Sequence, residues 1–155
     1  MVARVLSDLS DAGLNNSVKV VIQSEDSAVL KRITQTNNYT LAFRVTERNV
    51  TITEDVVKQI KALATYATLP RGLIQPTFQA YLLNNSGVVD QFHAQNMSVF
   101  VNYLRNVYVT LPNDYESDPT AEIDTMVQFF KVDGIITTFP ATARAYLGKL
   151  HMIYM

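Results

Sequence analysis

The sequence has no cysteine and no tryptophan, and it contains only five glycines and five prolines. Without cysteine there can be no disulfide bond, no thiolate metal site and no cysteine nucleophile. Thirteen basic and fourteen acidic side chains leave a net charge of -1. This balance does not favour a protein that binds nucleic acids or anionic membranes. No apolar run approaches the roughly 18 residues of a membrane-spanning helix. The N-terminal segment also lacks the apolar core and cleavage site of a signal peptide.

What the chain does contain is typical of one globular domain. Its 155 residues are 48% hydrophobic and 17% charged. This composition is sufficient for a buried core and too apolar for a disordered segment. The length favours one domain over two.

Five asparagines begin an Asn-x-Ser/Thr sequence, the acceptor signal for N-glycosylation: Asn15, Asn38, Asn49, Asn84 and Asn96. A chain of this composition would contain roughly two such sequences by chance. Two explanations remain open, namely coincidence in an asparagine-rich chain, or a secreted glycoprotein whose signal peptide lies outside this sequence. We favour the second, and we expect the full-length protein to be secreted, in the cell wall or at the cell surface.

Short runs of β-branched and aromatic residues alternate with segments of helical spacing. The runs predict strands at residues 18–22, 39–45, 97–104 and 134–137, with a further, ambiguous run at 66–69. The run at 18–22, apolar apart from Lys19, is typical of a strand buried on both faces. Strands that alternate with helices predict an α/β fold, in which helices cover a parallel sheet of about five strands.

Helices are predicted between the strands because capping residues precede segments with apolar residues three and four positions apart. These helix starts are residues 24–27, Thr53, Ser86, Asp118 with Pro119 behind it, and Pro140. The longest irregular segment, residues 106–118, follows the strand at 97–104. β/α proteins place their functional loops at the carboxyl ends of strands.

Four segments in order resemble consecutive blocks of the glycerophosphodiester phosphodiesterase family, most closely its plant secreted and cell-surface branch. They are KVVIQSEDSAVLKRI (19–33), NYTLAFRV (38–45), NMSVFVNYLRN (96–106) and VDGIITTFPATARAY (132–146). The resemblance covers residues 1–147, whereas the tail at 148–155 does not match. It implies a phosphodiesterase TIM (β/α)8 barrel, of which this chain supplies the C-terminal portion, about strands 4–8, with residues 134–137 as the last strand.

The resemblance also implies an activity, the hydrolysis of glycerophosphodiesters to glycerol 3-phosphate and an alcohol in lipid and glycerol metabolism. The family uses a divalent metal, usually Ca²⁺ or Mg²⁺. Its chemistry depends on His-Arg-Gly, Glu-x-Asp, a second histidine and Glu-x-Lys, all from its first three strands. If these strands are missing, the chain contains no catalytic residue, binds no metal and is inactive alone.

The histidines and Glu-x-Asp pairs that are present do not fit those roles. His93 lies in a predicted helix, His151 lies in the tail, and neither precedes Arg-Gly. In the pair at 116–118, Asp118 is expected to cap a helix. The pair at 122–124 lies within a helix, where residues two positions apart diverge by about 200°. We expect structural or solvated roles for both pairs.

Five residues near the ends of predicted strands are candidates for the substrate side of the barrel mouth: Gln23, Ser24, Arg44, Asn102 and Thr138. Asn102 stands where the resemblance implies a tryptophan beside the substrate, and Thr138 replaces a common acidic residue. The alternative is that all five are strand ends that face a loop.

Five strands without the first three would leave two unpaired sheet edges, near residues 18–23 and 134–137, and an exposed apolar inner face. We therefore expect the isolated chain to be marginally stable, or to self-associate through these edges. The simplest account is a partial gene product that begins within its domain. Two other interpretations stay open: a non-catalytic cell-wall or cell-surface binding module derived from the fold, and a complete small open α/β domain.

Overall fold

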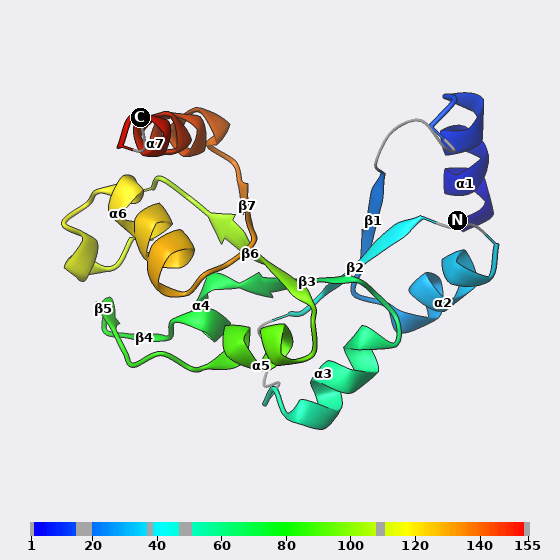
Figure 1. Cartoon of the computed structure of the whole chain (residues 1–155), viewed down its shortest axis with the longest axis horizontal. Helices are drawn as coiled ribbons and strands as arrows, with labels where there is room; N and C mark the ends of the chain where they lie inside the picture. Colours follow the sequence, from blue (N-terminus) through cyan, green and yellow to red (C-terminus); the bar gives the residue numbers. More distant parts are fainter. Residues whose placement is uncertain (1, 15–19, 37–38, 47–50, 108–110, 154–155) are drawn as a thin grey trace.

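The computed structural model describes residues 2–14, 20–36, 39–46, 51–107 and 111–153. A parallel five-stranded sheet forms its centre, in the order β1-β2-β3-β6-β7. The strands are β1 (Val21–Ser24), β2 (Thr40–Arg44), β3 (Tyr66–Pro70), β6 (Ser98–Leu104) and β7 (Gly134–Thr137). The sheet is curled, and β1 and β7 lie at its two ends without meeting (Figure 1). The result is a half-barrel.

Helices follow the strands along the chain, as expected for parallel connections. They are α1 (Val2–Asp11), α2 (Ser27–Thr36), α3 (Glu54–Lys61), α4 (Arg71–Ile74), α5 (Val88–Ala94), α6 (Pro119–Asp124) and α7 (Pro140–Ile153), with a 3-10 turn η2 (Asn113–Tyr115) and a π-helical turn η3 (Thr125–Phe129). In the described part of the chain, no helix is both long and apolar enough to cross a membrane.

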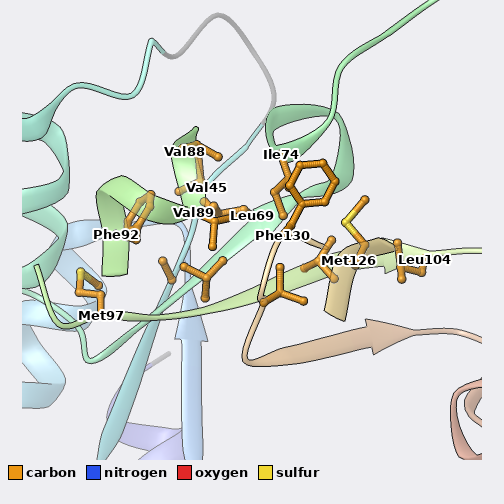
Figure 2. Packing of buried hydrophobic residues seen from close by; sticks show 14 of the residues in the cluster. Val45, Leu69, Ile74, Val88, Val89, Phe92, Met97, Leu104, Met126 and Phe130 are labelled. Carbon is orange, nitrogen blue, oxygen red and sulfur yellow. The ribbon is translucent and has the colours of Figure 1, made fainter. Parts of the chain in front are cut away.

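The main core lies between the sheet and the helices that follow its central strands (Figure 2). Leu69 of β3 and Val101 of β6 are fully buried, and both contribute to the same cluster as Phe92 of α5. Met126 and Phe130 extend this cluster toward β7. The alternation of side chains along each strand therefore directs one face of β3 and β6 into the core.

The opposite, concave face of the sheet carries Tyr66 and Phe100. Their rings meet edge to face, with centroids 5.3 Å apart and planes at 78°. The neighbouring strand has Gly134 beside this pair, and a Cβ atom there would overlap the Phe100 ring. Glycine thus lets β7 approach β6 closely at this point.

Two of the expected capping residues, Thr53 and Asp118, cap their helices, whereas the N-cap of α5 is Gly87 rather than the predicted Ser86. The Thr53 side chain accepts a hydrogen bond from Val56 N at 3.4 Å. Asp118 Oδ1 accepts one from Thr120 N at 2.7 Å, with Pro119 in the first helical turn. These side chains replace backbone acceptors that are missing in the first turn of a helix.

The strand predicted at 18–22 is observed as β1 at 21–24, with residues 18 and 19 outside the described residues, and its predicted burial was wrong. The run at 18–22 predicted a strand buried on both faces, but β1 is an edge strand, and 49% of the Val21 side chain is exposed. An apolar run indicates burial on both faces only where packed elements cover both faces of the sheet, and the face of β1 that carries Val21 and Gln23 is exposed. The ambiguous run at 66–69 is resolved as β3, a central strand.

Several elements were not predicted from the pattern, among them α1 and the β4–β5 hairpin. Residues 2–11 form α1, and residues 77–82 form a two-stranded hairpin of β4 (Thr77–Phe78) and β5 (Tyr81–Leu82). The closing helix begins at Pro140 as predicted, and α7 extends to Ile153. The Tyr146 hydroxyl secures α7 by donating to Asp124 Oδ1 of α6 at 2.9 Å.

Substitution of Phe92 by alanine tests the position of the core. Phe92 is fully buried, so Phe92→Ala should lower the free energy of unfolding by about 3–5 kcal/mol through lost apolar burial and a residual cavity. Phe129→Ala is the matched control, because 69% of Phe129 is exposed; it should change stability by less than about 0.5 kcal/mol. Urea unfolding followed by circular dichroism measures both. Equal losses in the two variants would contradict the assignment.

Candidate functional site

A cleft of about 870 Å³ lies at the carboxyl ends of the central strands. It is lined by Glu25, Arg44, Val45, Thr46, Pro70, Arg71, Gly72, Asn102, Tyr103, Arg105 and Glu122. In parallel sheets, and above all in β/α barrels, the carboxyl ends of strands are where ligands bind. Position therefore makes this cleft the candidate functional site.

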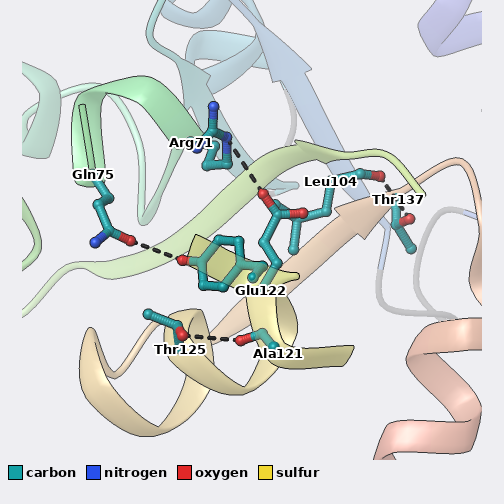
Figure 3. A network of polar contacts seen from close by, with 8 residues as sticks. Arg71, Gln75, Leu104, Ala121, Glu122, Thr125 and Thr137 are labelled. Carbon is teal, nitrogen blue, oxygen red and sulfur yellow. Dashed lines mark hydrogen bonds and ion pairs between the residues drawn. The ribbon is translucent and has the colours of Figure 1, made fainter. Parts of the chain in front are cut away.

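Arg71 reaches the cleft because it comes directly after the last residue of β3. Pro70 pairs with Asn102 of β6, so the two strand ends lie side by side and Arg71 lies next to β6. Its Nε contacts Glu122 Oε1 of α6 at 3.4 Å (Figure 3). Within the described residues, Arg71 Nη1 is buried without a hydrogen-bond partner.

Glu122 is a carboxyl group in an unusually dry position, with only 3% of its side chain exposed. Burial raises the pKa of Glu122 to about 7, although the Arg71 guanidinium acts in the opposite direction. Desolvation therefore outweighs the ion pair. Near neutral pH, both the protonated and the ionised carboxyl are populated beside the cleft.

The other cationic side chains of the cleft come from β2 and from the end of β6. The Arg44 guanidinium carbon lies 5.5 Å from the centre of the Tyr103 ring, a cation–π arrangement. Arg105 directly follows β6. Three arginines thus face two glutamates, Glu25 and Glu122, so the charge of the cleft is positive, and more so when Glu122 is protonated.

A polar framework fixes the elements around the cleft (Figure 3). The Tyr115 hydroxyl donates to Gln75 Oε1 at 2.9 Å and joins η2 to the end of α4. Burial raises the pKa of Tyr115, which keeps this hydroxyl a donor. Thr137 Oγ1 donates to Leu104 O at 2.8 Å, which ties the end of β7 to the end of β6.

Two of the five predicted mouth residues line the cleft, namely Arg44 and Asn102. The side chain of Asn102 is buried and that of Arg44 is half-buried. Gln23 is exposed on the edge strand β1, and Ser24 Oγ accepts a hydrogen bond from Asp26 N at 3.1 Å within a turn. Thr138 is exposed directly after β7. These three are not among the described residues that form the cleft, and the substrate role of all five stays a prediction.

The Glu-x-Asp pairs are arranged largely as expected. Asp118 caps α6, and the pair at 122–124 lies within α6, with Glu122 buried and Asp124 exposed. The expectation of a merely structural or solvated role was nevertheless incomplete for Glu122, because its carboxyl group is desolvated and lines the cleft.

The histidines lie apart from the cleft. His93 is in α5, and its Nε2 lies 3.0 Å from Asp133 Oδ2, which also accepts a hydrogen bond from Val99 N. These residues lie at the amino-terminal ends of β6 and β7, opposite the cleft. His151 falls within α7.

The described residues do not fit a divalent-cation site. Within the described ranges, no three histidine, aspartate or glutamate side chains lie together. Ca²⁺ and Mg²⁺ require several oxygen ligands. Glu122, which lines the cleft, is paired with a guanidinium, and a neighbouring positive charge disfavours a metal ion.

Of the glycosylation candidates, Asn84 and Asn96 are exposed. The carbonyl oxygen of Asn96 accepts a hydrogen bond from Lys61 Nζ at 2.7 Å. Asn15, Asn38 and Asn49 lie outside the described residues. Glycosylation of all five remains a prediction.

Sequence reasoning missed Arg71, Arg105 and Glu122. Each of the two arginines directly follows a strand. A search of the first residue after each predicted strand would have found Arg105, and it would also have found Arg71 if residues 66–70 had been assigned as a strand. Glu122 precedes the buried Met126 by four positions. A carboxylate four residues before a buried residue lies on the same, buried face of the helix. This spacing could have predicted that Glu122 is buried.

Comparison with known proteins places the chain in one family. The model of the glycerophosphoryl diester phosphodiesterase family matches residues 1–142. Glycerophosphodiester phosphodiesterase GDPDL7 of Arabidopsis thaliana is 38% identical over 129 residues, which are 83% of this chain and 17% of the relative. GDPDL6 of the same organism is 35% identical over 147 residues, 90% of this chain and 20% of the relative. The chain thus spans about a fifth of the length of these relatives.

A solved structure shows the same fold. The glycerophosphodiester phosphodiesterase of Thermotoga maritima superimposes with a TM-score of 0.50 and 19% sequence identity. The match covers 87% of this chain and 48% of that protein. The curled parallel sheet therefore resembles about half of a phosphodiesterase TIM barrel.

The raised pKa of Glu122 predicts a pH dependence of stability. Its carboxyl group binds a proton more tightly in the folded chain, with a pKa of about 7, than in the unfolded chain, where the ordinary value is 4.5. The resulting stabilisation is complete below pH 4.5, falls as the pH rises toward 7, and is then constant. Its size is at most about 3.5 kcal/mol, because a tenfold change in proton affinity corresponds to about 1.4 kcal/mol.

Urea unfolding at a series of pH values tests this prediction. Glu122→Gln should remove the fall in stability between pH 4.5 and 7, whereas Glu116→Gln, at an exposed position, should retain it. If wild type and Glu122→Gln show the same pH dependence, the carboxyl group does not titrate as the structure indicates.

Proposed function

This chain belongs to the glycerophosphoryl diester phosphodiesterase family, and on that premise we propose that it supplies the C-terminal portion, about strands 4–8, of a metal-dependent phosphodiesterase barrel. The complete enzyme would hydrolyse glycerophosphodiesters to glycerol 3-phosphate and an alcohol. In it, this chain forms one wall of the substrate mouth.

The observation that carries the proposal is the cleft with Arg44, Arg71 and Arg105 at the carboxyl ends of the parallel strands. A phosphodiester bears one negative charge at all ordinary pH values. Guanidinium groups match phosphate oxygens in shape and charge, and they remain protonated throughout. The amide of Asn102, on the same cleft, can hydrogen-bond the glycerol hydroxyls.

The remaining chemistry is assigned to the rest of the domain. The family fold implies a divalent metal, which when bound would polarise the phosphate. Because the described residues offer no ligand cluster for it, we place the metal and the acid–base histidines outside this chain. This chain then binds and orients the substrate, and it is inactive by itself.

Binding and activity measurements on the purified chain test this assignment. We expect glycerol 3-phosphate to shift amide signals of the cleft in NMR spectra, and Arg44→Gln and Arg71→Gln to weaken binding roughly tenfold, the worth of one charge-assisted contact. Arg144→Gln is the control, since Arg144 is exposed on α7. With glycerophosphocholine and Ca²⁺ or Mg²⁺, no glycerol 3-phosphate should be released.

Each result has a distinct meaning. Turnover by the short chain would overturn its proposed inactivity. Absence of binding, or an equal effect of Arg144→Gln, would remove the cleft as the substrate wall. Binding that persists in a complete protein without turnover would favour a non-catalytic binding module.

The open sheet also predicts self-association. Strand β1 is an edge with an exposed Val21, and β7 is the other edge; unpaired edges offer backbone groups to another chain. Sedimentation velocity should show concentration-dependent association. Val21→Lys should weaken it roughly tenfold by placing a charge on the edge, whereas Val5→Lys, at an exposed position on α1, should not. A monodisperse, cooperatively melting monomer would contradict the prediction.

A further inference from the structure

The contact between Arg71 and Glu122 leaves the guanidinium group incompletely satisfied. The distance of 3.4 Å from Arg71 Nε to Glu122 Oε1 is long for an ion pair, since charge-assisted hydrogen bonds usually measure about 2.7–2.9 Å. Arg71 Nη1 is buried and finds no hydrogen-bond acceptor among the described residues, which is unfavourable for a polar group. The carboxyl group therefore holds the guanidinium loosely, and the guanidinium can still take a second acceptor.

Both side chains line the cleft, but they differ in their access to solvent. The Arg71 side chain is 21% exposed, whereas the Glu122 side chain is 3% exposed. An anion that enters the cleft can therefore contact the guanidinium, while the carboxyl group stays shielded. Because Nη1 itself is buried, the guanidinium must turn toward the cleft to offer this N–H group to a ligand, and its loose contact with Glu122 permits that movement.

Arg71 is the charged group that keeps the Glu122 carboxyl ionised. Burial raises the pKa of Glu122 to about 7, and the Arg71 guanidinium acts in the opposite direction. Tyr115, on the neighbouring turn η2, is a neutral hydroxyl, because burial raises its pKa. If the charge of Arg71 is taken up by another anion, the opposing effect is lost and the pKa of Glu122 rises further.

The other charged side chains near Glu122 are more open to solvent. On the elements packed against α6, and at the two ends of α6 itself, they are Asp114, Asp118, Asp124 and Arg144, all exposed. Water and salt screen exposed charges strongly. Across the cleft lie Arg44, Arg105 and Glu25. None of these side chains lies between Arg71 and the buried carboxyl group, whose contact is direct.

We propose that the cleft takes up a proton from solvent when it binds a phosphate-bearing anion. Arg71 turns from Glu122 to a phosphate oxygen, and the Glu122 carboxylate accepts the proton because a buried carboxylate without a compensating charge is strongly disfavoured. The inference rests on the proposed function, since it assumes that the cleft binds phosphate. It makes Glu122 a positioning residue, which acts on the ligand through Arg71 and sets the pH range in which the cleft binds well.

Binding of a phosphodiester at a series of pH values tests the proposal. The probe is glycerophosphoglycerol, a diester whose single negative charge does not change between pH 6 and 8, followed by NMR spectroscopy of the full chain. Wild type should bind roughly five- to tenfold more weakly at pH 8 than at pH 6, because Glu122 must be protonated before or during binding. Glu122→Gln, which resembles the protonated carboxyl group, should bind equally at both pH values and as tightly as wild type at pH 6.

Two further variants separate the proton from the position of the side chain. Glu25→Gln is the matched control, because Glu25 also lines the cleft but is exposed; it should retain the pH dependence of wild type. Glu122→Ala should lose the pH dependence and also bind roughly threefold more weakly than Glu122→Gln, since it lacks the oxygen that orients Arg71, a loss comparable to one hydrogen bond. A structural role alone would not distinguish these variants by their pH profiles.

A direct titration of the carboxyl group remains informative if the Glu122 variants fold poorly. The chemical shift of the Glu122 carboxyl carbon in wild type, recorded against pH, gives the pKa of this group. Saturation with glycerophosphoglycerol should raise that pKa by about one unit or more, the counterpart of the tenfold change in affinity. The carboxyl carbon of Glu116, at an exposed position outside the cleft, should titrate identically with and without the diester.

The outcomes distinguish failure of this inference from failure of the proposed function. Absence of diester binding at every pH would remove the cleft as the substrate wall, and the inference with it. Binding that is independent of pH in wild type would overturn the inference alone. So would a pH dependence that persists in Glu122→Gln, or a carboxyl pKa that the diester leaves unchanged.

Discussion

The pairing of β3 with β6 positions most of the remaining structure. Their register, from Tyr66 opposite Ser98 to Pro70 opposite Asn102, directs Leu69 into the main core on one face. The same register brings the strand ends together, so that the residue after Pro70 lies beside the end of β6. Core packing and cleft geometry therefore depend on a single alignment, since a slip by one residue would exchange the two faces of the strand.

Burial of the Glu122 carboxyl group beside the cleft costs the fold stability. A carboxyl group at 3% exposure is strongly desolvated, and the contact with Arg71 at 3.4 Å offsets only part of that loss. A pair of this kind contributes little net stability, and a hydrophobic pair would serve the core as well. The arrangement does keep the Arg71 side chain beside the cleft. We infer that the cleft holds this guanidinium at the expense of stability.

Local patterns predicted the parts of the fold that local physics determines. The strand at 134–137 and the cap at Asp118 were predicted because β-branched runs and capping chemistry act over a few residues. The Arg71–Glu122 contact joins residues far apart in the sequence, so no local pattern contains it. The hairpin was missed because Gln79 and Ala80 adopt positive φ values without the glycine or asparagine that usually indicates such a turn.

The half-barrel accounts for the proposed role of the cleft as one wall of a substrate mouth whose catalytic groups come from the rest of the domain. In a closed barrel, side chains from strands around the whole ring face one mouth. Here five strands curve around one side of that mouth, and they contribute arginines, an amide and a desolvated carboxyl group. Groups that bind an anion can act from one side of the mouth, because each guanidinium contacts the anion independently of the others. Metal ligands must converge from several directions, so in the proposed enzyme they depend on closure of the ring. The proposed division between binding and chemistry thus follows the division of the barrel.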